Sequence, residues 1–451
     1  MQNDHINIYA EHEFDCFCGK KHRMSIGEVV IGSQAALRLP ETVKRLELGK
    51  KGFLVTDEKI FQSFGQDIYS AWLEKNINIE KYILSGRVHP DENTIGKVIC
   101  SVPFDVDYII SIGGGTITDI IRYVATRLNL PAISIPSAMT MDGFFTNMSV
   151  IVINGLQETY YIDYPKIILA DTDIIAKAPG FMNAAGVGEV VSKISATMDL
   201  YAAHLIKDVY YCDDVNEMMG QCISEGTDPV VVDGLPSGNP KAIELLTDSL
   251  YKSAVGMAWY GSSPCGSGAE HQMNHYWMMC QDAKGIPQSM HGQAVGVGAI
   301  INMMIWEEIL SLDFDDFDIE GALKKTWTRE DWATKIREVY GDGAEDILQL
   351  QKENHNFDRE KRRKEIECIL MHRDELREKL HSLPSAERIS KMLFECGGPN
   401  SPKQLKLEKE DIINSIYYAK DMRAGRYNSL WVAEALGVLD RVASKIISYF
   451  Y

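Results

Sequence analysis

Apolar and polar positions alternate in short blocks through the first third of the chain. The runs at 52–57 (GFLVTD) and 81–86 (KYILSG) predict strands. Helical spacing follows each of them, at 58–76 and in ENTIGKVICSV. Because strands that alternate with helices build parallel sheets covered on both faces, this region predicts an α/β domain.

The stretch VDYIISIGGGTITDIIRYVATRLNLPAISIPS contains the clearest unit of that domain. An apolar strand at 107–112 runs into three glycines, a helix from Thr116 to about Leu128 follows, and a second apolar strand covers 132–136. Residues without Cβ let the backbone approach a ligand, and the N–H groups at a helix start favour a phosphate. The glycines at 113–115 are therefore where a pyrophosphate would be held. The spacing G-G-G-T-x-x-D differs from the G-x-G-x-x-G fingerprint, and a tight turn with no ligand would also explain it.

The pattern changes after residue 172, where strand-like runs end and helical periodicity continues to the C-terminus. We therefore predict an α/β domain over 1–172 and an all-helical domain over 173–451. The charged segment DREKRRKEIECILMHRDELREKLHSL carries apolar residues at helical spacing, which predicts a solvated helix of the second domain.

Composition narrows the function. The chain has 451 residues, and its formal net charge of −18 argues against a nucleic-acid binder, which needs a basic face. An anionic substrate must therefore meet a local basic pocket. The first residues, MQNDHINIYAEHEFD, lack the basic and apolar regions of a signal peptide, and no run of about 18 apolar residues occurs, so we expect a cytoplasmic protein with no membrane partner. Nine cysteines, an odd number spread over a long chain, predict reduced thiols.

One local cysteine cluster, CFCGKKH, contains Cys16, Cys18 and His22. These residues could hold zinc, but a second ligand pair at zinc-finger spacing is missing. A turn that joins two early strands, with Gly19 at the bend, is the simpler interpretation.

Three histidines lie close together in GSGAEHQMNHYWMM and SMHGQAVGVGAI. His271 and His275 are four residues apart and share one helix face, and His291 begins another helix. Together with Glu189, which follows the small-residue segment AAGVG, they could form a metal site with room for substrate. A single histidine would be explained by packing, but three in a short apolar helical stretch favour a site.

Several segments carry a family resemblance. SIGGGTITDIIRYVA, ISIPSAMTMDGF, ILADTDIIAKAPGFMNAAGVGEVVSK, GSGAEHQMNH and MHGQAVGVG occur in the order seen in the sn-glycerol-1-phosphate dehydrogenases. That family belongs to the superfamily of iron-containing alcohol dehydrogenases and dehydroquinate synthases. CFCGKKHRMSIGEVVIGS and MRAGRYNSLWVAEALGVLD resemble its bacterial branch.

The resemblance implies a Rossmann-like nucleotide-binding domain followed by an all-helical metal-binding domain, the dehydroquinate synthase-like fold, with the active site in the cleft between them. It implies NAD(P)H-linked interconversion of dihydroxyacetone phosphate and sn-glycerol 1-phosphate, a step of phospholipid biosynthesis, with one divalent metal (nickel, zinc or iron). The partners it implies are a small phosphorylated ketone or polyol and further copies of the chain in a homo-oligomer.

The resemblance also assigns residues. His271, His291 and Glu189 match the metal ligands, His275 matches the substrate-facing proton carrier, and Asp142 in MDGF matches the substrate-contacting aspartate. Glu189 would also border the substrate. The residues matched to NAD or NADP are Asp57, Gly113, Gly114, Gly115, Thr116, Asp119, Ser137, Thr140 and Thr146.

Two positions depart from the pattern. Glu189 stands where these dehydrogenases usually have aspartate and dehydroquinate synthases have glutamate, and Gln293 stands where glutamate is common. Glu189 therefore keeps a dehydroquinate synthase-like cyclase or lyase that uses NAD transiently as an alternative. A dehydrogenase of another polyol or polyol phosphate and a non-catalytic binding subunit are further alternatives. Lys193, one turn beyond Glu189, is a candidate for the substrate phosphate, or it forms an ion pair with Glu189.

Overall fold

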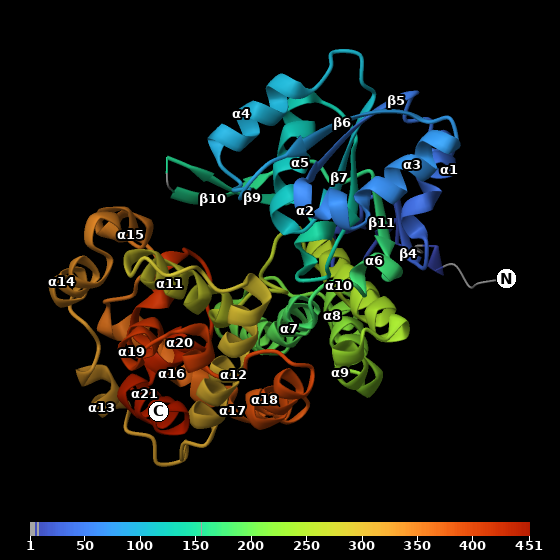
Figure 1. Cartoon of the computed structure of the whole chain (residues 1–451). Coiled ribbons are helices and arrows are strands. Elements are labelled where there is room, and N and C mark those ends of the chain that lie inside the picture. Colours follow the sequence, from blue (N-terminus) through green and yellow to red (C-terminus); the bar gives the residue numbers. More distant parts are fainter. Residues whose placement is uncertain (1–4, 7–8, 155) are drawn as a thin grey trace. The chain divides into compact units, whose positions relative to one another are not determined.

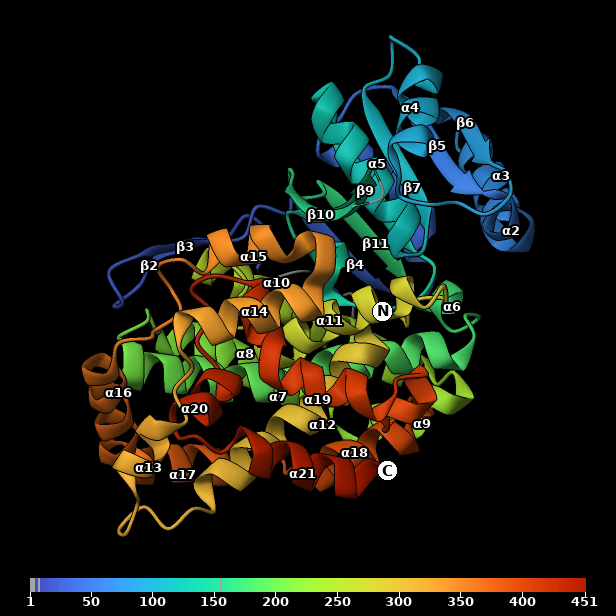
Figure 2. The same ribbon diagram turned by 90° about the vertical axis from the view of Figure 1, so that its left-hand side faces the viewer.

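The computed structural model describes residues 5–6, 9–154 and 156–451. The chain divides into two compact units. Unit 1 comprises Met1–Gly186 and Ser224–Gly261, and unit 2 comprises Val187–Ile223 and Ser262–Tyr451. Figures 1 and 2 show unit 1 as a sheet with helices and unit 2 as helices alone.

Unit 1 is built on a seven-stranded sheet with the order β1-β4-β11-β8-β7-β5-β6. Six strands are parallel, and β1 pairs with β4 in the antiparallel sense. The strands are β1 His5–Ile6, β4 Glu28–Gly32, β5 Lys51–Asp57, β6 Asn78–Leu84, β7 Tyr108–Gly113, β8 Ala132–Pro136 and β11 Ile167–Asp171. Two hairpins stand apart from this sheet: β2 Glu13–Asp15 with β3 Lys21–Arg23, and β9 Met148–Ile153 with β10 Leu156–Tyr161.

Helices cover both faces of the sheet, because successive strand residues point to opposite faces. Leu54 and Ile110 belong to a core cluster with helical residues such as Trp72, whereas Phe53 and Ile109 belong to a second cluster with residues such as Ile120. The helices of unit 1 are η1 Ala35–Arg38, α1 Leu39–Arg45, α2 Glu58–Ile60, η2 Phe61–Gly65, α3 Gln66–Glu74, α4 Glu92–Ser101, α5 Gly115–Leu128, η3 Asp142–Phe145, α6 Thr172–Ile175, α9 Pro229–Gly234, η4 Leu235–Ser237 and α10 Pro240–Tyr260.

Unit 2 contains helices and no strand among the described residues. Two helices, α7 Gly180–Lys207 and α8 Asp213–Gly226, run through the points where the units divide. The others are α11 Ala269–Ala283, α12 His291–Leu310, α13 Ile319–Lys324, α14 Arg329–Tyr340, η5 Gly341–Gly343, α15 Ala344–Leu350, α16 Arg359–Met371, α17 Arg373–His381, α18 Ala386–Glu395, η6 Pro402–Leu405, α19 Lys409–Tyr418, η7 Ala419–Met422, α20 Ser429–Ala435 and α21 Leu439–Phe450.

The predicted fold class is confirmed. The strands expected at 52–57, 81–86, 107–112 and 132–136 are β5, β6, β7 and β8, with ends shifted by up to three residues. The segment 58–76 is helical as predicted, although η2 interrupts it with a π-helical turn. The charged segment expected as one solvated helix forms two, α16 and α17, separated by His372.

The last strand ends at Asp171, so the change from strands to helices lies where the sequence places it. The compact units divide differently, because α9 and α10 pack with unit 1. A functional boundary between residues 172 and 173 stays a prediction. By length and composition α12 could cross a membrane, but 83% of its apolar window is buried inside the structure, as in a core helix.

Candidate active site

The central cluster of unit 2 joins three helices. Glu189 lies on α7, His271 on the first turn of α11, and His291 is the first residue of α12. Each offers one ligand atom, and these atoms lie within 4.8 Å of one another. The structure thus brings together the three residues that the sequence predicts as metal ligands.

Close helix contacts produce this convergence. A Cβ on Gly188 would lie 2.1 Å from the carbonyl oxygen of Gly292, and one on Gly296 would lie 2.8 Å from Cα of Gly188. Only glycine lets the two backbones approach so closely. Gly188 belongs to the small-residue segment AAGVG, and because α7 begins at Gly180, this segment lies within the helix.

The spacing of the ligand atoms fits a metal ion. Oε2 of Glu189 lies 3.4 Å from Nε2 of His291, and Oε1 lies 3.7 Å from Nε2 of His271. Two ligands bound tetrahedrally at ordinary metal–ligand lengths lie about 3.4 Å apart. Oε2 of Glu189 is buried with no hydrogen-bond partner among the described residues, which is costly unless a cation faces it.

Charge favours an ionised carboxylate at this position. Burial alone would raise the pKa of Glu189, but Lys193, His291 and His271 hold it well below its usual range. Lys193 donates to Oε1 of Glu189 at 2.5 Å and to the carbonyl of Gly266 at 3.0 Å, and its side chain is 1% exposed. The ion-pair interpretation of Lys193 is therefore the one that the geometry supports.

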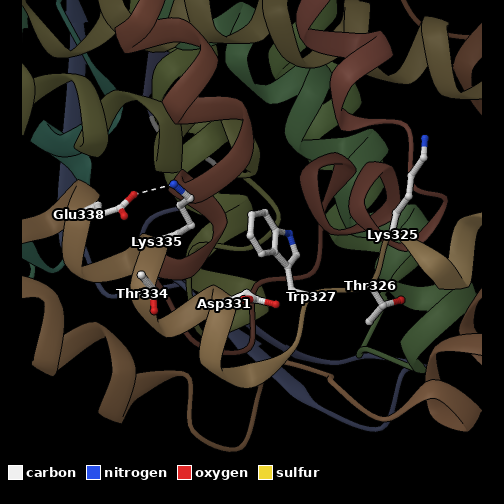
Figure 3. Close-up of a pocket in the computed structure, with 7 residues that line it drawn as sticks. All are labelled: Lys325, Thr326, Trp327, Asp331, Thr334, Lys335 and Glu338. Carbon is white, nitrogen blue, oxygen red and sulfur yellow. Dashed lines mark hydrogen bonds and ion pairs between the residues drawn. The ribbon is translucent and has the colours of Figure 1, made fainter.

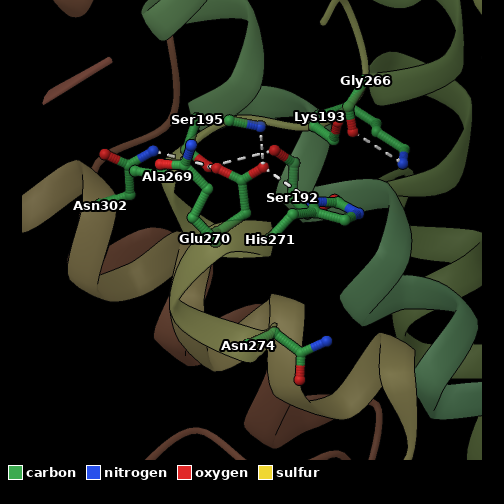
Figure 4. Close-up of polar contacts among 12 residues, drawn as sticks. Ser192, Lys193, Ser195, Gly266, Ala269, Glu270, His271, Asn274 and Asn302 are labelled. Atoms are coloured by element: carbon green, nitrogen blue, oxygen red, sulfur yellow. Dashed lines mark hydrogen bonds and ion pairs between the residues drawn. The ribbon is translucent and has the colours of Figure 1, made fainter. Parts of the chain in front are cut away.

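A second layer of polar groups, which local sequence patterns do not predict, orients His271. Nδ1 of His271 lies 2.9 Å from Oε1 of Glu270, whose other oxygen accepts from Ser195 at 2.8 Å and Asn302 at 3.0 Å (Figure 4). A carboxylate that accepts from Nδ1 leaves Nε2 available to a metal. The only sequence signal for this role is that Glu270 directly precedes His271.

Asp199 is connected to Glu270 through Asn302, which donates hydrogen bonds to both carboxylates. It accepts hydrogen bonds from the backbone of Ala269 at 2.8 Å, from Asn302 at 2.9 Å and from Trp306 at 2.7 Å. Burial, together with the charge of Glu270, raises the pKa of Asp199 to about 7. Glu270 differs, because hydrogen bonding and charge from His271 outweigh burial and lower its pKa.

His275 lies one helical turn beyond His271 and has a different environment. Its Nε2 lies 2.9 Å from Nη2 of Arg423, which follows η7. Burial, followed by the charges of Arg423, His291 and His271, lowers the pKa of His275 well below its ordinary value. His275 is therefore neutral near neutral pH, with Nε2 as an acceptor. Arg423 belongs to the segment MRAGRYNSLW, and the sequence alone indicates no role for it.

Unit 1 contains the predicted cofactor turn. Gly114 is the N-cap residue of α5, a helix of 14 residues. Because glycine has no side chain, Gly114 makes no side-chain hydrogen bond to the first backbone N–H groups of this helix. A Cβ on Gly114 would meet no atom within 4 Å, and the backbone N–H of Ser137 donates to the carbonyl of Gly113 at 3.0 Å. The turn and the segment after β8 thus lie side by side.

Other predicted cofactor residues already have partners within unit 1. Asp119 is buried in an ion pair with Arg122 at 2.8 Å, and burial raises the pKa of its carboxyl group. The carbonyl of Thr146 accepts from Arg122 at 2.6 Å, and Asp57 caps α2 by accepting from the N–H of Ile60. Cofactor roles for these residues, as for Gly115, Thr116 and Thr140, stay predictions.

Asp142, the predicted substrate contact, is also placed in unit 1. It begins η3, is 8% exposed, and accepts a hydrogen bond from Ser253 of α10 at 2.7 Å. A pocket of about 440 Å³ in unit 2 lies elsewhere and contains none of the predicted site residues (Figure 3). It is lined by Lys325, Thr326, Trp327, Asp331, Thr334, Lys335 and Glu338.

Comparisons with known proteins agree on the class. Residues 30–179 match the family described as iron-containing alcohol dehydrogenase. A glycerol dehydrogenase structure from Schizosaccharomyces pombe aligns with a TM-score of 0.60 at 16% identity, covering 98% of this chain and 94% of that one. A sulfoacetaldehyde reductase from Bifidobacterium kashiwanohense, solved in complex with NAD+, also gives 0.60, at 14% identity over 93% and 96% of the two chains. The fold is therefore that of the iron-containing alcohol dehydrogenases.

Curated relatives define the family within this class. The glycerol-1-phosphate dehydrogenase [NAD(P)+] of Geobacillus stearothermophilus is 28% identical over 93% of this chain and 96% of its own length. That of Bacillus subtilis (strain 168) is 31% identical over 62% of this chain and 71% of its own length. The chain belongs to the glycerol-1-phosphate dehydrogenase family.

Proposed function

We propose that the chain is an NAD(P)-dependent oxidoreductase that interconverts dihydroxyacetone phosphate and sn-glycerol 1-phosphate. The observation that carries the proposal is the buried carboxylate of Glu189 between the Nε2 atoms of His271 and His291, within a member of this dehydrogenase family. Location in the cytoplasm and assembly into a homo-oligomer stay predictions.

Glu189, His271 and His291 are the residues that would hold one divalent metal. When bound there, the metal supplies Lewis-acid stabilisation of negative charge on a substrate oxygen. A carboxylate with two imidazoles suits nickel, zinc or iron, so the ligand set leaves these three metals open. Glu270 fixes the ring of His271 through Nδ1, and the orphaned Oε2 of Glu189 explains why the position favours a cation.

His275 is suited to move a proton. In the structure Arg423 donates to Nε2 of His275 and holds the imidazole in one orientation. The substrate hydroxyl would replace Arg423 at this neutral nitrogen, which then takes up the hydroxyl proton when the alcohol is oxidised and returns it when the ketone is reduced. His271 would bind the metal and His275 would carry the proton, so two histidines on one face of α11 have different roles.

Unit 1 supplies the groups for the cofactor and for a substrate hydroxyl. The N-terminus of α5 offers backbone N–H groups to a pyrophosphate at a turn where Gly114 leaves space. Asp142 is held by Ser253, and its carboxylate is suited to accept a hydrogen bond from a substrate hydroxyl.

Arg423 is the residue that we propose for the substrate phosphate. Its guanidinium lies beside His275, and a planar guanidinium can donate two parallel hydrogen bonds to a phosphate. Lys193 is less suited, because its ammonium group is buried against Glu189 and Gly266.

A substrate comparison tests the role of Arg423. Charged hydrogen bonds contribute about 1.5–3 kcal/mol, so Arg423→Ala should lower the kcat/KM ratio of dihydroxyacetone phosphate over dihydroxyacetone by about 10- to 150-fold. The ratio matters because loss of the His275 contact slows both substrates alike. Arg423→Lys should retain part of the preference, and an unchanged ratio in both variants would exclude Arg423 as the phosphate site.

The function itself is tested by following NADH and NADPH oxidation with the metal-reconstituted chain. Dihydroxyacetone phosphate is compared with a panel of unphosphorylated ketones and aldehydes, and Glu189→Gln serves as the matched control. We expect rapid oxidation with the phosphorylated ketone and none with the control. If the metal-loaded, NAD-binding chain oxidised neither NADH nor NADPH with any substrate of the panel, the proposal would be refuted. A cyclase or lyase that regenerates its cofactor would then be favoured.

A further inference from the structure

A short hairpin near the N-terminus brings three potential metal ligands together within unit 1. Strands β2 and β3 pair around the segment CFCGKK, as the sequence predicts, and the N–H of Cys16 donates to the carbonyl of Lys20 at 3.0 Å. Gly19 has a φ of +84°, a left-handed conformation that favours glycine, and its N–H donates to the carbonyl of Cys16 at 3.0 Å. The turn therefore has a defined shape before any ligand binds.

The turn directs its two thiols to the same place. The ligand atoms of Cys16, Cys18 and His22 lie within 4.8 Å of one another, and neither cysteine is in a disulfide. Sγ of Cys18 is 3.5 Å from Nε2 of His22. A thiolate at 2.3 Å and an imidazole at about 2.05 Å from one tetrahedral zinc ion lie about 3.6 Å apart, so this spacing suits zinc.

The imidazole is oriented for metal binding. His22 is fully buried, and its Nδ1 lies 2.7 Å from the carbonyl oxygen of Trp259, in the last turn of α10. A carbonyl accepts only from a protonated nitrogen, so Nδ1 carries the hydrogen and Nε2 presents its lone pair toward Cys18. Metal-binding histidines are usually held in this way by a backbone carbonyl or a carboxylate.

The surroundings fix this geometry further. The rings of His22 and Trp259 stack with centroids 5.8 Å apart, and Phe14 meets both rings edge-on. The N–H of Cys18 points to Sγ of Cys16 at 3.3 Å, a contact that favours a thiolate. Phe17, between the two cysteines, is fully exposed, whereas Cys16 and Cys18 are partly buried.

We propose that Cys16, Cys18 and His22 bind a zinc ion at a second metal site, separate in residues and chemistry from Glu189, His271 and His291. Three protein donors leave one tetrahedral position for a further side chain or water. The ion would fasten the β2–β3 hairpin to the end of α10 through His22, which gives it a structural role in unit 1. The proposal does not depend on the reaction that the chain catalyses.

Cobalt substitution of the reduced full chain tests the site. Thiolate ligands give bound Co²⁺ a sulfur-to-metal charge-transfer absorption, whereas a site of one carboxylate and two histidines gives none. We expect this absorption in the parent and in Glu189→Gln. We expect its complete loss in Cys16→Ser/Cys18→Ser, while Cys100→Ser, which changes an exposed cysteine of unit 1, retains it.

Zinc content provides a second measurement. Zinc-loaded parent should contain one more equivalent per chain than Cys16→Ser/Cys18→Ser, and the same difference should appear in the Glu189→Gln background. Absence of the cobalt absorption in the reduced parent, or its persistence in the double variant, would overturn the proposal. If the double variant fails to fold, the single variants Cys16→Ser and Cys18→Ser decide, because each removes one thiolate and should lower the intensity of the band, whereas an unchanged band in both would overturn the proposal.

Discussion

Glu270 offers a direct test of the site geometry, because it orients a predicted metal ligand without being one. Its Oε1 lies 2.9 Å from Nδ1 of His271 and accepts from the N–H of Gly268 at 2.5 Å, while Oε2 accepts from Ser195 and Asn302. In Glu270→Gln one of these oxygens becomes an NH₂ group. At least one buried donor then faces another donor.

The expected effect is weaker metal binding. Removing the partner that orients a metal-binding histidine typically costs 10- to 100-fold in affinity, which corresponds to about 1.4–2.8 kcal/mol. The loss of charge acts in the same direction, because hydrogen bonding and charge from Glu270 raise the pKa of His271 against the effect of its burial. We therefore expect the dissociation constant for Zn²⁺ to rise by about one to two orders of magnitude.

The assay is a Zn²⁺ titration against a chromophoric chelator in the Cys16→Ser/Cys18→Ser background, so that one centre is measured. Glu307→Gln is the matched control, because Glu307, near the C-terminal end of α12, accepts from the N–H of Ala386 on α18 and lies outside this network. The control should bind zinc like its parent. Equal affinity in Glu270→Gln and the control, with both folded, would show that Glu270 does not position His271.

Three further predictions test other parts of the structure. His271→Ala should lose bound metal and NADH oxidation together, whereas His275→Ala should keep its metal and lose NADH oxidation. The measurements are the metal content per chain and the rate of NADH oxidation. If both variants kept metal and activity, these histidines would have only a packing role. Gly114→Ala should weaken NADH binding about tenfold at unchanged melting temperature, because the new Cβ enters open space at the phosphate turn, and Gly96→Ala, also open, is the control. Burial lowers the pKa of His355 to about 4, so the unfolded chain takes up a proton first as the pH falls below about 6.5, and stability present above that pH is lost toward pH 4. Between about pH 7 and pH 5 the unfolding free energy of the parent should fall by about 2 kcal/mol more than that of His355→Phe, and equal slopes would refute the assigned pKa.

Local sequence signals predicted the neighbouring strands β8, β7, β5 and β6 of the sheet and missed β11 and β4. The strands β5, β7 and β8 are continuous apolar runs bounded by clear turns, so periodicity was sufficient. The strands β4 and β11 pair with each other across 139 residues, Ile167 with Glu28, and this pairing depends on the folded sheet rather than on a local pattern. The hairpin of β9 and β10 was also missed, since the segments MSVIVI and LQETYY show no strict alternation of apolar and polar residues.

The candidate site divides in the same way. Glu189, His271 and His291 could be predicted because metal ligands are restricted to a few residue types, and two of the three carry recognisable local motifs. Glu270, Asn302 and Arg423 could not, because their roles are set by hydrogen bonds that span 32 and 148 residues of sequence. Each is an ordinary polar residue until the helices pack.

Glycine packing explains why the ligands meet although they come from distant segments. Gly188 precedes Glu189 by one residue and Gly292 follows His291 by one, and these two glycines mark the contact of α7 with α12. On the other side of α12, a Cβ on Gly298 would lie 3.0 Å from Cβ of Glu270, next to His271. Every predicted ligand is therefore adjacent to a point where a helix approaches α12 at a glycine, too closely for a Cβ at Gly188 and with little room for one at Gly298. The glycines of AAGVGE and HGQAVGVG act as spacing elements of the metal centre, which is why these motifs identify the site better than the histidines alone.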